Sequence, residues 1–141
     1  MASAKSYLPL SIDPSEANLW IAQAEYNADK VVVVVDRANV TPAPTSAAWS
    51  YVVPFHLAGT VSGAVIPYSG DVGAGVSDTS TAGTATIDDA TPAVVMGRGQ
   101  VTVSGDAAEW LNSEKATVTI TYTNLRGGTA TDTFEVTFTT P

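Results

Sequence analysis

The residue best suited to catalysis or metal binding is His56, the single histidine of a chain that has no cysteine. A hydrolytic nucleophile needs a base within hydrogen-bond reach, and a zinc site needs three or four strong ligands. His56 alternates with Phe55 and Leu57 in a pattern typical of a strand, so its ring is expected to point away from the apolar face, towards solvent or a subunit contact. We therefore expect no catalytic residue, no metal ligand, no cofactor and no enzymatic activity.

Four aspartates could hold calcium through carboxylate oxygens: Asp71, Asp78, Asp88 and Asp89. None of them follows the Asp-x-Asp-x-Asp-Gly spacing that would make a calcium site specific. Aspartates in loops more often cap turns by accepting hydrogen bonds from nearby backbone amides. Turn capping is the favoured interpretation, and calcium binding by a loop stays an open alternative.

Two glycine-rich stretches, Gly73-Ala74-Gly75 and Gly97-Arg98-Gly99, could cradle a phosphate with backbone amides. Neither opens a helix after a buried strand, and neither is followed by Lys and then Ser or Thr. A turn or a β-bulge is the better interpretation of both.

Three tryptophans could stack on sugar rings, as in carbohydrate-binding modules: Trp20, Trp49 and Trp110. Trp110 follows Asp106 in a corner just before a predicted strand, where sandwich domains place a buried aromatic side chain. Trp20 lies on the apolar face of a predicted helix, so it is expected to pack on this domain or on a neighbour.

The 141 residues fit one domain with an arm. Six Lys and Arg are scattered singly in a chain of net charge −8, which argues against nucleic-acid binding through phosphates. The longest apolar run, Val31 to Val35, is far too short to span a bilayer, and no signal peptide is expected. We expect no membrane partner, and a product made in a cytoplasm.

The first 45 residues are expected to form a separate unit. Residues 1–12 are predicted to be an extended arm, and Asp13, Pro14 and Glu16 predict the start of a helix that runs to about Asn27. The valine run from Val31 to Asp36 predicts a strand covered on both faces. Prolines between residues 41 and 45 then predict a boundary, with an arm, helix and strand at 1–45 and a β domain at 46–141.

From Ser50 onward the sequence predicts β-structure. Alternation places Val53 and Phe55 on one face, and Pro54 in that run indicates an edge or bulged strand. The clearest element is a hairpin from Ala116 to Thr139, whose two arms each alternate apolar residues with threonines. About seven short strands separated by turns predict a mainly β antiparallel sandwich. The expected core is Val53, Phe55, Trp110, Ile120, Tyr122, Phe134, Val136 and Phe138.

Three Thr/Ala/Gly-rich segments carry a family resemblance: Val76–Ile87, Gln100–Trp110 and Ala116–Ile120. Over about the last two-thirds of the chain they resemble Ig-like β-sandwich proteins of tailed bacteriophages, above all the capsid decoration (cement) proteins. The chain departs from a plain Ig domain in lacking a cysteine pair and in its predicted helix and strand at 13–36.

The resemblance implies a noncatalytic virion protein that decorates the outside of a capsid and stabilises it by bridging capsid subunits. It implies two partners, the major capsid protein and further copies of the chain in a homotrimer. The contacts are then expected from the 1–45 unit, through Tyr7, Leu8, Leu10, Ile12, Trp20 and Ile21. An Ig-like adhesion module on the head or tail, binding host-surface glycans, is the alternative, and a tail-tube or baseplate protein is a variant of the first interpretation.

Overall fold

The computed structural model describes residues 30–37, 39–125 and 127–141, and its regular elements there are strands. They are β1 (Val31–Val35), β2 (Trp49–Gly59), β3 (Gly70–Asp71), β4 (Gly73–Asp78), β5 (Ala85–Ile87), β6 (Ala93–Val94), β7 (Arg98–Gly105), β8 (Lys115–Thr123) and β9 (Thr129–Thr137). The predicted arm and helix lie outside the described residues, together with the expected contact residues Tyr7, Leu8, Leu10, Ile12, Trp20 and Ile21.

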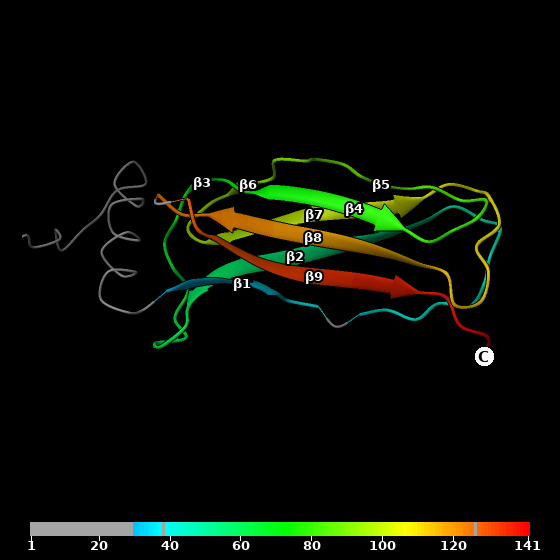
Figure 1. Cartoon of the computed structure of the whole chain (residues 1–141), viewed down its shortest axis with the longest axis horizontal. Helices are drawn as coiled ribbons and strands as arrows, with labels where there is room; N and C mark the ends of the chain where they lie inside the picture. The colour runs from blue at the N-terminus through cyan, green and yellow to red at the C-terminus, as the bar shows by residue number, and fades with distance from the viewer. Residues whose placement is uncertain (1–29, 38, 126) are drawn as a thin grey trace, which may run out of the picture.

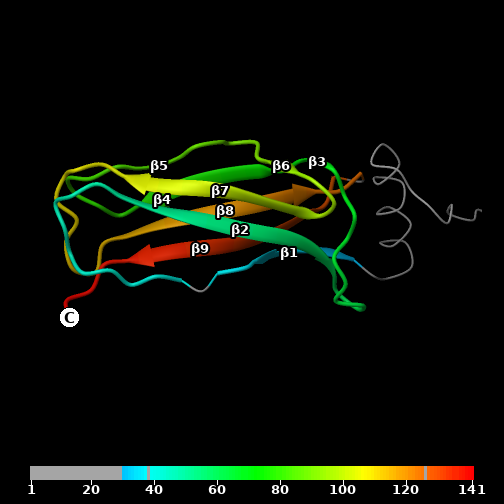
Figure 2. The same cartoon turned by 180° about the vertical axis from the view of Figure 1, so that it is seen from behind.

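Seven strands form two antiparallel sheets, and β3 pairs with β6 in a small ribbon (Figure 1). One sheet has the order β1-β2-β7-β5 and the other β4-β8-β9. With the seven strands lettered A to G along the chain, these orders are A-B-E-D and C-F-G, the arrangement of a constant-type immunoglobulin sandwich. The two sheets face each other across a shared core (Figure 2).

The core is formed by alternate residues of the long strands, because successive side chains of a strand point to opposite faces. β8 shows this most clearly: Ala116, Val118, Ile120 and Tyr122 are buried, whereas the threonines between them are half-buried. The residues expected in the core are all among the buried ones, namely Val53, Phe55, Trp110, Ile120, Tyr122, Phe134, Val136 and Phe138.

The valine strand is an edge strand and is not covered on both faces, so that prediction is wrong. β1 pairs with β2 only, which leaves Val31 and Val33 buried and Val32 and Val34 half-buried. A run of valines fits the half-buried surface of an edge as well as a central position.

The prediction that Pro54 marks an edge or bulged strand is also wrong, because β2 lies between β1 and β7. The position of the proline explains this. Its missing N–H would face β1 where that strand ends, and its carbonyl oxygen accepts a hydrogen bond from the Asp36 amide at 2.8 Å. The ladder therefore loses no donor that it needs.

The boundary expected near residue 45 does not separate two units in the described part of the chain. β1 belongs to one sheet, Val40 then forms a parallel bridge with Val136 of β9, and Thr45 bridges to Trp110. The chain thus crosses from one sheet to the other after β1. At the crossing, the Asp132 carboxylate accepts hydrogen bonds from the amides of Val35 (2.8 Å) and Thr133 (2.9 Å).

Candidate interaction surface

The two ends of the sandwich differ in how they are built. The open end comprises Lys30, the loop at 60–69, the β6–β7 turn at 95–98 and the β8–β9 loop, and it is where β1 begins (Figures 1 and 2). The closed end comprises the loops at 79–84 and 106–114 and the C-terminal residues 138–141. Loops that gather at one end of a sandwich are the usual place for binding surfaces in this architecture.

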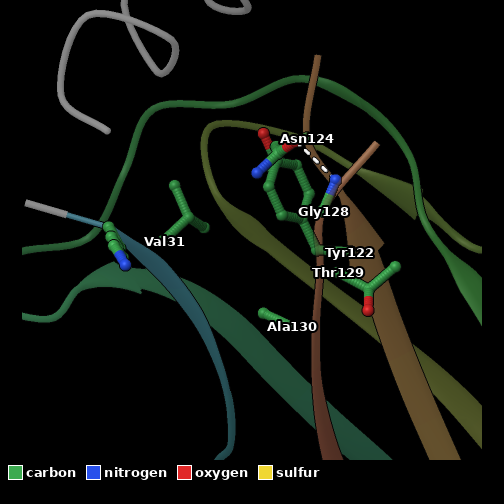
Figure 3. A pocket seen from close by; sticks show the side chains of 7 residues that line it. Val31, Tyr122, Asn124, Gly128, Thr129 and Ala130 are labelled. Atoms are coloured by element: carbon green, nitrogen blue, oxygen red, sulfur yellow. Dashed lines mark hydrogen bonds between the residues drawn. The ribbon is translucent and has the colours of Figure 1, made fainter. Parts of the chain in front are cut away.

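A hollow of about 290 Å³ opens between β1 and the β8–β9 hairpin at the open end (Figure 3). It has an apolar floor that includes Val31 and Tyr122, both of which are largely buried. Its rim is polar, and there the Asn124 side-chain oxygen accepts a hydrogen bond from the Gly128 amide at 2.9 Å. The lining residues are Lys30, Val31, Tyr122, Asn124, Gly128, Thr129 and Ala130.

Four large apolar side chains are exposed on the loops of the same end. Val61 is 77% exposed, Val95 66%, Leu125 56% and Met96 51%. Single exposed apolar residues are ordinary, but exposed apolar side chains gathered in one region mark interaction sites. The open end therefore has the character of a contact surface.

The β6–β7 turn is held in an unusual backbone conformation. Met96 and Gly97 have φ angles of 50° and 85°, and Val95 and Arg98 exchange backbone hydrogen bonds, as in a type I′ hairpin turn. The Met96 amide also donates to the Ser69 hydroxyl at 3.0 Å. The predicted turn or bulge at residues 97–99 is thus a tight turn, displaced by about two residues towards the N-terminus.

Beneath this turn, the Tyr68 ring packs edge-on against Tyr122 with 5.4 Å between ring centroids. Its hydroxyl donates to the carbonyl oxygen of Asp71 at 2.9 Å. Burial, and secondarily the charge of Asp71, raise the pKa of Tyr68. The phenol therefore stays protonated at neutral pH and acts as a structural donor.

An aromatic cluster fills the core at the closed end. Trp110 stacks on Phe138 at 5.3 Å between centroids and meets Trp49 edge-on at 5.2 Å. A Cβ atom at Gly83 would overlap the Trp110 ring, and one at Gly105 would overlap the Trp49 ring. Neither indole N–H has a hydrogen-bond partner within the residues that the structure describes. Trp110 is fully buried, so it offers no face for a sugar.

Glu114 fastens the loops of the closed end. Its carboxylate accepts hydrogen bonds from the amides of Leu111 (2.8 Å) and Thr81 (2.9 Å) and from the Ser80 hydroxyl (3.3 Å). The Leu111 amide first, and then the Thr81 amide, lower the pKa of Glu114 by stabilising its charged form. One side chain thereby joins the β7–β8 loop to the β4–β5 loop.

Three of the four aspartates considered for calcium, Asp78, Asp88 and Asp89, bind backbone amides, as turn-capping residues do. Asp78 accepts hydrogen bonds from Ser80 and Ala85, Asp88 from Thr102, and Asp89 from Thr91, at distances from 2.8 to 3.2 Å. In the described ranges, no three or more of His, Asp and Glu lie where they could hold a metal ion. These contacts give the carboxylates a role in holding the loops of the sandwich.

The side chain of His56 is 18% exposed, so its ring is only partly open to solvent. Its Nδ1 lies 2.5 Å from a carboxyl oxygen of Asp36, just after β1. The ring does point to the outer face, as strand alternation predicts, but the contact with Asp36 covers it. His56 therefore helps to hold the end of β1 on β2.

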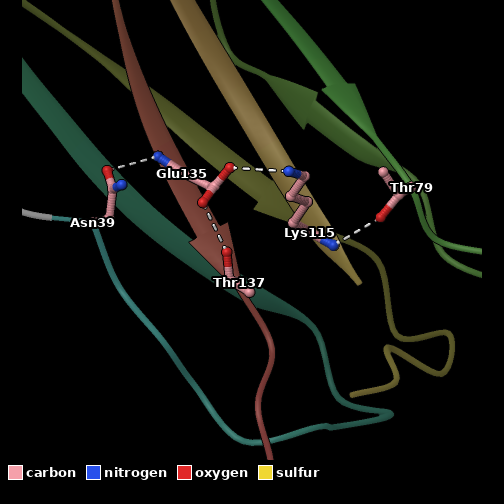
Figure 4. A network of polar contacts seen from close by, with 5 residues as sticks. All are labelled: Asn39, Thr79, Lys115, Glu135 and Thr137. Carbon is pink, nitrogen blue, oxygen red and sulfur yellow. Dashed lines mark hydrogen bonds and ion pairs between the residues drawn. The ribbon is translucent and has the colours of Figure 1, made fainter. Parts of the chain in front are cut away.

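A polar network joins β8 and β9 to their neighbours on the outer face of the three-stranded sheet (Figure 4). The Lys115 ammonium lies 3.4 Å from the Glu135 carboxylate, and the Glu135 amide donates to the Asn39 side chain at 3.0 Å. Thr137 donates to Glu135 and the Lys115 amide donates to Thr79. An exposed ion pair of this kind contributes at most about 1 kcal/mol. The place of the Lys115–Glu135 ion pair in this network indicates a structural role.

No family model matches the chain, and no curated protein matches it. A solved structure, the ASH / PapD-like domain of human CEP192 (PapD-like domain 7), is similar, with a TM-score of 0.47 and 9% sequence identity over 100% of this chain and 96% of that one. The assignment of the sandwich rests on the strand order of its sheets rather than on this likeness. The part of the chain that the structure describes contains no helix long and apolar enough to cross a membrane.

The sequence did not predict the open end as a surface. Tyr122 lies in the core, as predicted, and the hairpin predicted from Ala116 to Thr139 assigns its loop no role beyond joining two strands. The signal that could have indicated this surface is a set of apolar residues that belong to no alternating strand pattern: Val61, Val95, Met96 and Leu125.

Proposed function

We propose that the protein is a noncatalytic structural component of a tailed-phage virion, which decorates and stabilises the outside of the capsid by bridging capsid subunits. The observation that carries this proposal is the contrast between the ends of the sandwich. The loop carboxylates are occupied with backbone amides, whereas exposed apolar side chains gather where the chain enters β1.

The contact region follows from the fold. Residues 31–45 are part of the sandwich, so the contacts proposed for residues 1–45 are reassigned to the residues before Lys30 together with the open end. Its partners are the major capsid protein and copies of the chain itself, arranged as a homotrimer. Apolar side chains give affinity by burying area, at about 25 cal/mol per Å² before the costs of association.

Binding of host glycans is the less favoured function. It needs an exposed aromatic platform, whereas among the described tryptophans Trp110 is buried and the half-buried Trp49 packs against it. A structural role requires no such platform.

The test is reconstitution of undecorated heads with purified protein, followed by sedimentation to measure occupancy. Deletion of residues 1–28, and separately the paired change Met96→Glu with Leu125→Glu, are expected to reduce occupancy strongly. Leu111→Glu is the matched control, because Leu111 is also exposed (43%) but lies at the closed end. Full occupancy by the truncated protein, or equal losses for the open-end and closed-end variants, would refute the proposal.

A further inference from the structure

The two sheets have four edges: those of β4 and β9 are partly covered, that of β5 is very short, and the fourth belongs to β1. The edge of β4 receives residues 90–92, since the Ala74 amide donates to the Ala90 carbonyl (2.9 Å) and the Val72 amide to the Pro92 carbonyl (3.2 Å). Part of the β9 edge pairs with Val40, and β5 has only three residues. β1 is the edge strand that consists only of valines.

The backbone of β1 has two sides. The even-numbered residues bond to β2: the Thr60 amide donates to the Lys30 carbonyl (2.7 Å) and the Asp36 amide to the Pro54 carbonyl (2.8 Å). In an antiparallel ladder this alternation turns the backbone groups of Val31, Val33 and Val35 outwards.

Of the outward-facing backbone amides of β1, only one forms a hydrogen bond within the described residues. The Val35 amide donates to Asp132 at 2.8 Å, which closes the far end of the strand. The amides of Val31 and Val33 have no hydrogen-bond partner within the described residues. A hollow separates Val31 from Thr129 and Ala130 of β9, so no backbone of the described residues pairs with this part of the strand (Figure 3). An open edge of this kind is a ready template for another strand.

We infer that β1 is a strand-pairing edge that joins two copies of this chain, with β1 of each copy antiparallel to β1 of the other about a two-fold axis at Val32. In this register Val31 lies opposite the partner's Val33, and Val33 opposite the partner's Val31. Each such pair exchanges two backbone hydrogen bonds, so the contact forms about four. It uses the amides that are unpaired in one copy and leaves the Val35 amide with Asp132.

A second copy fits this edge because the contact is self-complementary. The two-fold register satisfies the same groups on both copies, as an isologous interface requires. Charged residues and prolines usually prevent an edge strand from pairing with another chain. The segment from Val31 to Val35 contains neither. Lys30 lies diagonally across from the partner's Asp36 on the same face, so opposite charges flank the valines.

The inference goes beyond the proposed function, because it concerns pairs of copies in solution and needs no capsid. Its failure would leave capsid decoration untouched, and a protein that fails to bind capsids could still pair through β1. The pairing predicts dimers, which distinguishes it from the homotrimer proposed for the capsid-bound protein.

Disulfide trapping tests the register directly. Val32 faces the partner's Val32 in a non-hydrogen-bonded pair, where Cα atoms lie about 4.5 Å apart, within the range for a disulfide. Since the chain has no cysteine, Val32→Cys should form one disulfide-linked dimer under mild oxidation, seen on a non-reducing gel. Ser77→Cys is the matched control, an exposed position on the outer face of β4. Absence of a Val32→Cys dimer, or equal crosslinking of Ser77→Cys, would overturn the inference.

Sedimentation of the full chain over a concentration series tests the same contact without crosslinking. The unmodified chain should show a monomer–dimer equilibrium, and Val32→Lys should weaken it several-fold because two like charges then face each other. Val32→Thr keeps a β-branched, neutral residue and should behave like the unmodified chain. Circular dichroism shows whether each variant is folded. Equal association of Val32→Lys and the unmodified chain, or a monomer at every concentration, would refute β1 pairing.

Discussion

The loops at the two ends of the sandwich are held in place differently: by side-chain packing at the closed end, and by a tight backbone turn at the open end. At the closed end, Trp110, Trp49 and Phe138 pack against one another, with Gly83 and Gly105 making room for the indole rings. At the open end, order comes from backbone conformation. The tight turn at Met96–Gly97 fixes the loops while their apolar side chains stay in solvent.

This difference separates stability from interaction. A side chain that packs in the core cannot also bind a partner. At the closed end the large side chains pack in the core. Turns fixed by their backbone leave side chains available at little cost in stability. The comparison predicts that truncating a packed aromatic side chain of the closed end is severe and that truncating an exposed apolar side chain of the open end is mild. At the open end, backbone changes are the damaging ones.

The largest effect is expected from Trp110→Ala. The indole is fully buried between ring partners, so its removal should lower the free energy of unfolding by about 3–5 kcal/mol. Leu125→Ala at the open end should change it by less than about 0.5 kcal/mol, because that side chain is 56% exposed. Urea denaturation followed by tryptophan fluorescence or circular dichroism measures both. Similar losses in the two variants would show that the ends do not differ as described.

A smaller but clear effect is expected from backbone changes at the open end. Gly97→Ala places a Cβ against the Ile66 carbonyl at a φ of 85° and should cost more than the roughly 1–3 kcal/mol of strain alone. Gly127→Ala has a similar φ of 87° but open space around the new atom, so about 1 kcal/mol is expected. Thermal unfolding of the pair separates overlap from strain. Equal melting temperatures would mean that the Ile66 contact contributes nothing.

The smallest effect is expected from Glu114→Gln, which tests the hydrogen bonds through which Glu114 joins two loops of the closed end. The pKa of Glu114 is lowered in the folded protein, so its contribution is present above the unfolded pKa and is lost as pH falls through the folded value. The variant should therefore melt slightly below the unmodified chain at pH 7, and the difference should shrink as the pH falls below the ordinary pKa of glutamate and vanish below the lowered pKa of the folded protein. Thermal scans across that range measure it. A constant difference at all pH values would assign the effect to packing rather than to charge.

The hairpin was the most predictable part of the fold. Alternation of apolar residues and threonines predicted strands that the structure confirms as β8 and β9, paired from Lys115↔Thr137 to Thr123↔Thr129. Local pattern suffices there because both arms bury one face against the same core. The two-residue strands β3 and β6 have too few residues to show any period, and the segment before β3 forms only an isolated bridge at Val65.

Strand position and surface character could not be read from local pattern. Whether β1 is central or at an edge depends on where the chain crosses to the other sheet between β1 and Val40. The partners at that crossing, Asp132 and Val136, are far away in sequence. The hollow at the open end likewise depends on the distance between Lys30 and the β8–β9 loop. Both are properties of tertiary arrangement, which periodicity does not encode.

The crossing of the chain after β1 has a mechanical consequence. β1 begins at one end of the sandwich and the C-terminus lies at the other (Figure 1), so tension applied between the start of β1 and the C-terminus runs along the strands. Such tension loads the five β1–β2 residue pairs in shear together, and the Val40–β9 bridge lies on the same path. Backbone hydrogen bonds loaded in shear must all break together, whereas hydrogen bonds that are unzipped break one after another. The sandwich is therefore built to resist being pulled lengthwise from its N-terminal side.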